Sequence, residues 1–354
     1  MLVRSTMLDD VSDYITLRLS TSGRAPTPEL FCPFRPLIHP DVDPIHEQSV
    51  AWARSVGLVR TDMQARRLSE SKLGWLVARA FPSARPSALQ IAADWTTLFC
   101  MLDDRIEKIS SSQQVAASLT GLLEAFRGGP VRFEDDFASY ALQDLRRRML
   151  EQSSPGWIDG FSEQLERLIA CFIMEAVDRE EQVIPELPAY LEMREVSVGL
   201  YMQFELFELT EGIKLPLEVH RHPVVASLKK KACNLVGWAN DIFTYEKEIT
   251  HRELHNLLLV LIQAEGMSIE AALDKAVMLH DEEMHAFIRL ASDLPLLGSD
   301  GDAALQRYIA MLCTWIRGHI DWGHETGRYV TVHGGPMSSR DWDPLVFVSL
   351  ESCR

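Results

Sequence analysis

Apolar residues recur at three- and four-residue spacing along most of the chain after Asp43. This spacing gathers them on one face of a helix. Strict alternation of apolar and polar residues, which would predict a strand, is not sustained anywhere. The pattern therefore predicts an all-α fold, with helical segments at residues 46–57, 86–107, 134–149, 157–178, 188–213, 223–248, 251–264, 269–292 and 302–322.

Several of these segments are apolar on more than one side, which is typical of the inner helices of a large bundle. Six of the seventeen prolines lie between Pro26 and Pro44, so this stretch is expected to be extended rather than helical throughout. With 354 residues, 47% of them hydrophobic, the chain can bury a sizeable core. We predict one helical domain over residues 26–335, a weakly ordered segment at 1–25 and a tail at 336–354.

The charge and the cysteines narrow the class of protein. A formal net charge of −16 argues against nucleic-acid and anionic-membrane partners, which require clustered Lys and Arg. No apolar run approaches the roughly 18 residues of a membrane-spanning helix. The six cysteines contain no CxxC pair, so their spacing predicts neither a zinc site nor a disulfide framework. These features predict a cytoplasmic protein that binds neither nucleic acid nor membranes.

The first candidate site is an acidic segment at the end of an apolar run. Asp103, Asp104 and Glu107 follow the apolar residues 98–102. On a helix Asp103 and Glu107 share one face, and Phe99 and Cys100 lie on that face one turn deeper. Adjacent acids are common on solvated helix faces, so the buried helix before them is what favours a functional site.

The second candidate site is the row Asn240, Thr244 and Glu248. On a helix these residues share one face, so amide, hydroxyl and carboxylate oxygens could hold one cation, and Lys247 could reach a phosphate from the flank. A polar stripe on a surface helix is the alternative, but the apolar residues 235–239 indicate burial nearby. Two such rows facing each other across an apolar cavity would hold Mg²⁺ and a diphosphate above a hydrocarbon chain.

Together the two segments resemble the metal-binding motifs of class I terpene cyclases, especially the bacterial sesquiterpene synthases. That family carries a DDxxD or DDxxE motif and an NDxxSxxKE motif. This chain has DDRIE at 103–107 and NDIFTYEKE at 240–248, and Thr244 keeps a hydroxyl in the serine position. The resemblance extends from about Phe31 to about Tyr329. It implies a helical bundle around a central cavity.

The resemblance also implies three Mg²⁺ ions. Asp103 would hold two of them, and Asp104 and Glu107 are further candidate ligands whose direct contact with metal is left open. Asn240, Thr244 and Glu248 would hold the third.

Other positions of the family pattern imply a diphosphate site. Arg194 lies 46 residues before Asn240, where the family places an arginine that senses the diphosphate. Lys247 and the pair Arg328 and Tyr329 would also bind the diphosphate.

A backbone carbonyl beyond the sensor is expected to assist ionisation, and either Gly199 or Val198 could supply it. The chain departs from the family at Glu195, where a second arginine is common.

Aromatic residues are candidates for the pocket wall. Trp315 and Trp322 lie seven residues apart on one predicted helix face, and ordinary core packing would also explain them. By the resemblance, these two residues would line the pocket together with Phe99, Cys100 and Phe204. Ring faces stabilise cations by about 2 kcal/mol or more when desolvated.

The resemblance implies Mg²⁺-dependent cyclisation of a linear prenyl diphosphate, with farnesyl diphosphate as the expected substrate and a homodimer as an open alternative to a monomer. A diterpene cyclase acting on geranylgeranyl diphosphate is the first alternative. A chain-elongating synthase would normally carry a second aspartate-rich motif. A di-iron bundle would use the Glu-x-x-His pairs at 248–251 and 282–285, which chance also explains. A non-catalytic helical scaffold gives no reason for these motifs to coexist.

Overall fold

The computed structural model describes residues 27–329 apart from 132–135, Arg252 and 296–298, together with Val11 and Ile15. Within these residues all regular structure is helical, so the predicted all-α class is confirmed. Apart from Val11 and Ile15, the predicted N-terminal segment lies outside the described residues, and so does the predicted C-terminal tail. Residues 27–41 contain no helix, as the prolines predict.

The helices follow one another with short connections. Their bounds are α2 (Val42–Ser55), α3 (Asp62–Glu70), α4 (Leu73–Ala80), α5 (Pro86–Ile106), α6 (Ser112–Phe126), α7 (Phe137–Leu150), α8 (Pro155–Glu181), α9 (Leu187–Ser197), α10 (Leu200–Glu211), α11 (Leu217–His220), α12 (Pro223–Thr250), α13 (Leu257–Glu265), α14 (Ile269–Ala291), α15 (Ser299–Glu325) and the 3₁₀ turn η1 (Gly327–Tyr329).

The structure differs from the predicted segments in three ways. The helices α3, α4, α6 and α11 were not predicted. The predicted segment 188–213 is two helices, α9 and α10, because the chain breaks at Val198 and Gly199. The predicted segment 251–264 becomes helical only at Leu257, where the side chain of Asn256 accepts the N–H of Leu258 and caps α13.

Four helices, among them the three that carry Asp103, Arg194 and Asn240, begin in a similar way. α5, α8, α9 and α12 each have a proline in the first turn. Proline is tolerated there because the first N–H groups of a helix have no intrahelical acceptor. The long apolar faces that follow account for the length of α5 and α12.

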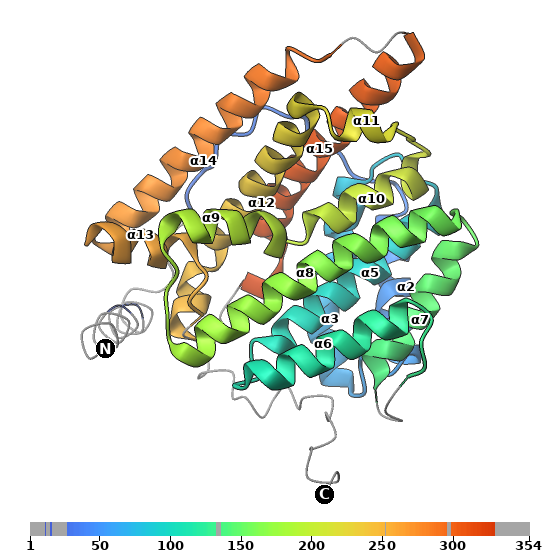
Figure 1. Cartoon of the computed structure of the whole chain (residues 1–354), viewed down its shortest axis with the longest axis horizontal. Coiled ribbons are helices and arrows are strands. Elements are labelled where there is room, and N and C mark those ends of the chain that lie inside the picture. The colour runs from blue at the N-terminus through green and yellow to red at the C-terminus, as the bar shows by residue number, and fades with distance from the viewer. Residues whose placement is uncertain are drawn as a thin grey trace, which may run out of the picture.

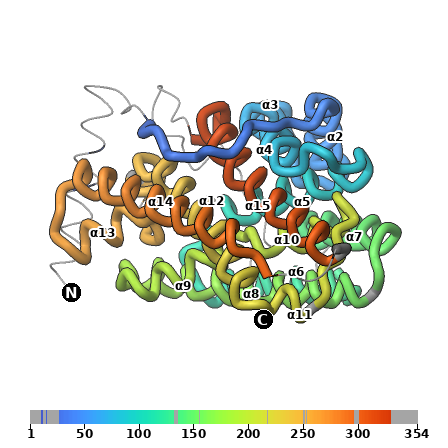
Figure 2. The backbone as a smooth tube through the Cα atoms, turned by 90° about the horizontal axis from the view of Figure 1, so that it is seen from above, coloured from blue at the N-terminus to red at the C-terminus, as the bar shows by residue number. Residues whose placement is uncertain are grey.

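The bundle places α12 and α15 near its centre (Figures 1 and 2). α12 packs against α9, α14 and α15, while α5 packs against α2, α4 and α7. α10 contacts both α5 and α12. The two helices that carry the oxygen-rich rows therefore belong to different walls of the bundle and are connected through α10. A connected cluster of buried apolar side chains extends through these walls.

No helix among the described residues combines the length and apolar character needed to cross a bilayer. Five of the six cysteines lie in the described part of the chain, and all five are free.

Candidate active site

The acidic segment lies where α5 leaves the core. The helix is buried through Leu98, and Asp103 and Asp104 occupy its last turn, with Glu107 at the C-cap. The side chains of Asp103 and Asp104 are 35% and 16% exposed. The C-terminus of a helix carries partial negative charge, so carboxylates there are disfavoured unless cations lie close.

The second row extends along the middle and end of α12. Thr244 Oγ1 donates to the carbonyl of Asn240 over 2.7 Å, and Glu248 Oε2 accepts from Asn256 Nδ2 over 2.9 Å. Burial raises the pKa of Glu248, and the nearby charge of Asp241 raises it further. The row is thus a set of oxygen atoms in a mostly buried environment.

Cationic side chains and the turn η1 (Gly327–Tyr329), which we call the terminal turn, connect the two rows. Lys247 Nζ on α12 lies 3.8 Å from Asp104 Oδ1, and Arg328 Nη1 donates to Asp104 Oδ2 over 2.6 Å. On the other side, Asn240 Nδ2 donates to Tyr329 Oη over 2.6 Å. The turn η1 therefore contacts the acidic segment through Arg328 and the α12 row through Tyr329.

The neighbouring carboxylates of the acidic segment differ in charge environment. Burial raises the pKa of Asp103, and the like charge of Glu107 raises it further. Burial acts in the same direction on Asp104, but Arg328 and Lys247 outweigh it and hold the pKa of Asp104 below its usual value. Burial raises the pKa of Glu107 as well. Asp103 and Glu107 are therefore the two carboxylates of this segment whose negative charge is least compensated by neighbouring cations.

This donor set fits a divalent cation. Carboxylate, amide and hydroxyl oxygens are hard ligands, and buried like-charged carboxylates are relieved by Mg²⁺. Among the described residues, however, no three His, Cys, Asp or Glu side chains are close enough to form a metal cage. A bound cation would therefore need Asn240, Thr244 or oxygens from a ligand to complete its coordination.

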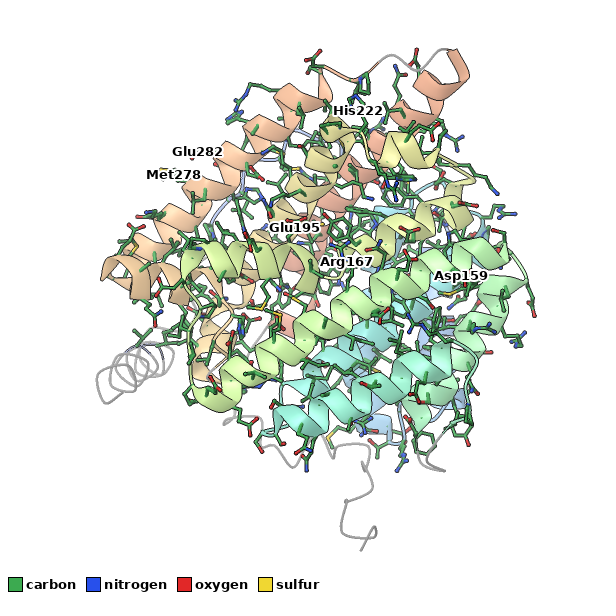
Figure 3. The ribbon with its side chains drawn as sticks, in the orientation of Figure 1. Asp159, Arg167, Glu195, His222, Met278 and Glu282 are labelled. Carbon is green, nitrogen blue, oxygen red and sulfur yellow. The ribbon has the colours of Figure 1, made fainter. Side chains whose placement is uncertain are left out.

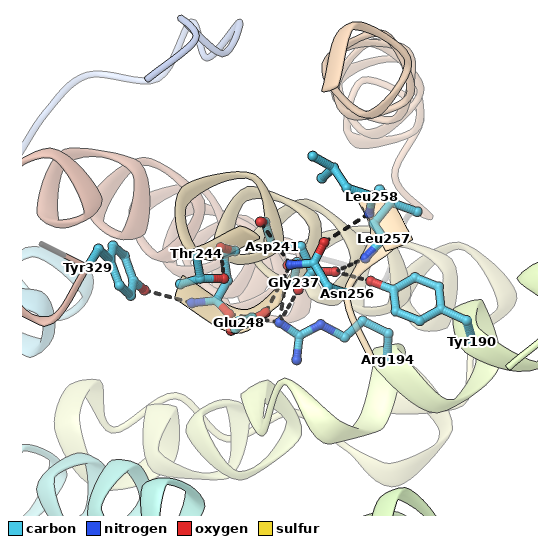
Figure 4. Close-up of polar contacts among 11 residues, drawn as sticks. Tyr190, Arg194, Gly237, Asp241, Thr244, Glu248, Asn256, Leu257, Leu258 and Tyr329 are labelled. Atoms are coloured by element: carbon cyan, nitrogen blue, oxygen red, sulfur yellow. Dashed lines mark hydrogen bonds and ion pairs between the residues drawn. The ribbon is translucent and has the colours of Figure 1, made fainter. Parts of the chain in front are cut away.

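Arg194 reaches the α12 row from α9 (Figure 4). Its Nη2 donates to Asp241 Oδ1 over 2.6 Å, to Asn240 Oδ1 over 2.8 Å and to the carbonyl of Gly237 over 3.3 Å. A Cβ at Gly237 would lie 3.4 Å from Arg194 Cγ, so the absence of a side chain there lets α9 approach. Arg194 Nε is buried and has no partner among the described residues, which leaves a donor for an anion.

Asp241 is a functional candidate that the sequence reasoning missed. It is fully buried, and its Oδ2 accepts from Tyr190 Oη and from the backbone N–H of Leu257, the latter over 2.9 Å. Asn256 also holds this region, because its Nδ2 donates to the carbonyl of Asp241 over 3.0 Å. Tyr190 lies one helical turn before Arg194, and residues four apart share a face of a helix. This spacing was the sequence feature that could have indicated a common partner for the two side chains.

The helix break lies against the acidic helix. Gly199 has φ +73°, a conformation that favours glycine, and a Cβ there would lie 2.6 Å from Phe99 Cζ. The Phe99 ring also stacks on Phe172 at 6.1 Å between centroids. The side chain of Val198 faces α12 near Gly237. The break therefore places Val198 and Gly199 between α5 and α12.

Comparisons with known proteins decide the family. Residues 94–286 match the family model described as "Terpene synthase family 2, C-terminal metal binding". This match spans more than half of the chain and includes both oxygen-rich rows. The chain belongs to this terpene synthase family. The resemblance predicted from the two motifs is confirmed.

Individual relatives agree with this assignment. The chain is 31% identical to the germacrene A synthase of Nostoc punctiforme, over 85% of this chain and 94% of that protein. It is 33% identical to the (+)-T-muurolol synthase of Roseiflexus castenholzii, over 86% and 94%. Among solved structures, a cucumene synthase variant superposes with a TM-score of 0.75 at 26% identity, covering 84% of this chain and 100% of that one.

In this terpene synthase the predicted wall residues lie in different environments. Trp315 is buried edge-to-face against Phe81 at 5.8 Å, and Phe204 packs against Phe207 at 5.6 Å. Trp322 Nε1 donates to the carbonyl of Ser71 over 2.9 Å.

The Trp322 ring contacts the Tyr329 ring, with 5.1 Å between their centroids. Trp322 therefore fixes the terminal turn, whereas Trp315 and Phe204 have the contacts of core residues.

Cys100 is adjacent to the terminal turn as well. Its carbonyl accepts from Arg328 Nη2 over 3.5 Å, and burial raises the pKa of its thiol to about 12. The thiol is therefore neutral at physiological pH and contributes an apolar surface rather than a nucleophile.

The alternative metal readings find no support in the described residues. His251 Nδ1 contacts the carbonyl of Lys247 over 2.6 Å, and His285 stacks on Phe31 with 4.7 Å between ring centroids.

A surface pocket of about 410 Å³ lies between α2, α5 and α7 and shares no residue with the two rows. It is therefore not a candidate for the diphosphate site.

Two buried rings that the sequence reasoning missed support the terminal turn. Phe243 on α12 stacks on Tyr329 with 6.1 Å between ring centroids, and the ring centroids of His319 on α15 and Trp322 lie 5.8 Å apart. Burial lowers the pKa of His319 to about 3, and the charge of Arg194 adds to this effect. The imidazole is therefore neutral at physiological pH.

His319→Phe is expected to reduce the acid sensitivity of folding. The histidine takes up a proton near pH 6.5 in the unfolded chain but only near pH 3 in the folded protein. Wild-type stability from this group is therefore complete above pH 6.5 and is lost as the pH falls, at roughly 1 kcal/mol per pH unit between about pH 6 and pH 4. Denaturant unfolding across this range should give a shallower slope for the variant, and parallel curves would contradict the assignment.

Proposed function

We propose that this terpene synthase catalyses Mg²⁺-dependent cyclisation of farnesyl diphosphate to a sesquiterpene. The name of its Roseiflexus relative specifies (2E,6E)-farnesyl diphosphate cyclisation, and the Nostoc relative is a germacrene A synthase. Geranylgeranyl diphosphate cyclisation, chain elongation and a scaffold role gain no support from these relatives. A homodimer and a cytoplasmic location stay predictions.

One observation carries the proposal. The turn η1 donates to Asp104 through Arg328 and accepts from Asn240 through Tyr329. Cationic and hydroxyl groups thus lie between two rows of hard oxygen ligands. This arrangement suits a ligand that bears several negative charges next to metal ions.

The rows divide the metal ligands. We assign Asp103 and Glu107 to two Mg²⁺ ions, and Asn240, Thr244 and Glu248 to a third. Bound Mg²⁺ would neutralise the charge that develops on the departing diphosphate. Asp104 is assigned a different role, because its carboxylate is already paired with Arg328 at 2.6 Å.

The remaining residues act on the diphosphate and the hydrocarbon. Arg194, Lys247, Arg328 and Tyr329 supply donors to the diphosphate oxygens. If Asn240 binds Mg²⁺ through Oδ1, the hydrogen bond that Arg194 donates to this atom in the present structure must break.

As the allylic bond breaks, the carbonyl of either Val198 or Gly199 would face the developing positive charge, and the rings of the wall would exclude water. A central cavity deep enough for a C15 chain is part of the proposal.

Incubation with single substrates tests the function. The purified protein is given geranyl, farnesyl or geranylgeranyl diphosphate with Mg²⁺, and the extracts are examined by mass spectrometry. We expect a cyclic C15 product and stoichiometric diphosphate only from farnesyl diphosphate, and none after addition of EDTA. A C20 hydrocarbon would favour the diterpene alternative, and products of added chain length would favour elongation.

Phe99→Leu is expected to change the ratio of products. The Phe99 ring lies directly against the break at Gly199, so a smaller side chain alters the surface on which the hydrocarbon folds. Phe126→Leu, in the fully buried core of α6, is the matched control. Each change should cost less than about 1.5 kcal/mol of stability. Gas chromatography should show altered products for Phe99→Leu alone, and an unchanged profile would place Phe99 outside the pocket.

A further inference from the structure

Glu195 connects three helices on the outer side of the break. Its Oε1 accepts from Tyr201 Oη on α10 over 2.5 Å, and its Oε2 lies 2.9 Å from Lys230 Nζ on α12. Glu195 is labelled on α9 in Figure 3, beside the helix α8 that carries Arg167. We call Glu195, Tyr201 and Lys230 the outer clamp.

The outer clamp spans the break without using the backbone. Glu195 lies three residues before Val198, and Tyr201 lies two residues after Gly199. Gly199 is the N-cap of α10 and has no side chain to bond the first N–H groups. The backbone bonds at the end of α9 extend only as far as the break, where Val198 N–H donates to the carbonyl of Arg194 and Gly199 N–H donates to the carbonyl of Val196. Side-chain contacts therefore carry much of the restraint on the angle between the two helices.

The bond from Tyr201 is the stronger part of the clamp. The side chain of Glu195 is 16% exposed, whereas that of Lys230 is 52% exposed. An ion pair exposed to that extent contributes little because solvent screens it. A short hydrogen bond from a hydroxyl to a carboxylate in a mostly buried place is stronger.

Neighbouring groups fix the ring of Tyr201. Phe204 contacts it edge-to-face at 5.7 Å, and Arg167 Cζ lies 5.1 Å from its centroid. Lys229 Nζ lies 5.5 Å away over the same ring. Burial raises the pKa of the Tyr201 hydroxyl, and the nearby Cys233 raises it further. The hydroxyl therefore stays protonated and keeps donating to Glu195 across the physiological pH range.

We infer that the outer clamp is a positioning device that sets the direction of the Val198 and Gly199 carbonyls relative to Arg194. Glu195 directly follows Arg194 in α9, so the clamp restrains the same helical turn that carries the guanidinium. A rotation of α10 about Gly199 would also move the contact with Phe99. The consequence for product choice rests on the proposed function, whereas the restraint on the break does not.

Tyr201→Phe tests the effect on the reaction. The variant removes one hydroxyl and keeps the ring. We expect kcat with farnesyl diphosphate to fall about 5–10-fold, the loss of one hydrogen bond, with KM changed less than about twofold. The share of products released before the final ring closure should rise. Tyr140→Phe, at a 45% exposed position on α7, is the control.

Glu195→Ala should reproduce the Tyr201→Phe profile, and the double variant should differ little from either single variant because both remove the same bond. Lys230→Met removes only the solvent-screened ion pair of the clamp, so it should change kcat less than about twofold. Glu195→Ala also supplies the answer if Tyr201→Phe does not fold. Wild-type product ratios and kcat in both variants, with or without a lower Tm, would overturn the positioning role.

Hydrogen exchange separates the clamp from the proposed function. Amides of residues 196–202 should exchange faster in Tyr201→Phe than in wild type, and Tyr140→Phe should show no difference there. This result is expected even if farnesyl diphosphate is not the substrate. Unchanged exchange at the break would overturn the clamp itself, whereas absent turnover in the wild type would overturn only the proposed function.

Discussion

Asp103→Asn is expected to lower kcat for diphosphate release by about 10²–10³-fold, the usual consequence of losing one strong electrostatic contact in a transition state. Asp103 lies beside Glu107 and has the weaker contact with Arg328, whose Nη2 is 3.7 Å away. Its carboxylate is therefore the one most available to a cation. Asparagine keeps the shape of the side chain and removes the charge.

Thermal unfolding without metal distinguishes this loss from a folding defect. Burial and the charge of Glu107 already disfavour an ionised Asp103, so the neutral variant is expected to have a Tm at or above that of wild type. In a Mg²⁺ titration, the residual activity should reach half of its maximum at a higher Mg²⁺ concentration than the wild-type activity, because one ligand is lost. Wild-type kcat in Asp103→Asn would remove this residue from the ligands.

Arg328→Met is expected to lower kcat by about 10²-fold, because a charged donor to the diphosphate is lost. Among the described residues, Asp104 then keeps the longer contact to Lys247 at 3.8 Å and the weaker attraction of Lys108. Folding should therefore also be destabilised, by about 3 kcal/mol or less since Asp104 is 16% exposed. Steady-state kinetics and denaturant unfolding of the same preparation measure the two effects.

A double-mutant cycle with Asp104→Asn tests the assigned role of Asp104. If Asp104 serves to hold Arg328, the double variant should regain stability relative to Arg328→Met and lose no further activity. Fully additive losses of activity would instead make Asp104 an independent metal ligand. An unchanged rate and product profile in Arg328→Met would remove Arg328 from the site.

The long helices could be predicted because their apolar periodicity extends over many turns. α5 and α12 begin at a proline and end within three residues of the predicted limits. α6 carries Val115, Leu119 and Leu122 at helical spacing, so its sequence also contained the signal. α3 is short and polar, and its capping box between Thr61 and Gln64 was the only local indication.

The candidate site was less accessible to sequence reasoning. The motifs located both rows, but adjacent carboxylates such as Asp103 and Asp104 look equivalent in sequence. The partner that distinguishes them, Arg328, is 224 residues away from Asp104. The role of Asp241 likewise depends on Tyr190, 51 residues earlier. Such long-range contacts are set by packing and not by local spacing.

A crystal structure with Mn²⁺ and inorganic diphosphate would test the central claim most directly. Mn²⁺ replaces Mg²⁺ at oxygen sites and is located by its anomalous signal. We expect peaks beside Asp103 and beside Asn240, Thr244 and Glu248, with the diphosphate between them and in contact with Arg194 and Arg328. Diphosphate bound without metal at either row, or peaks confined to the outer surface, would contradict the account.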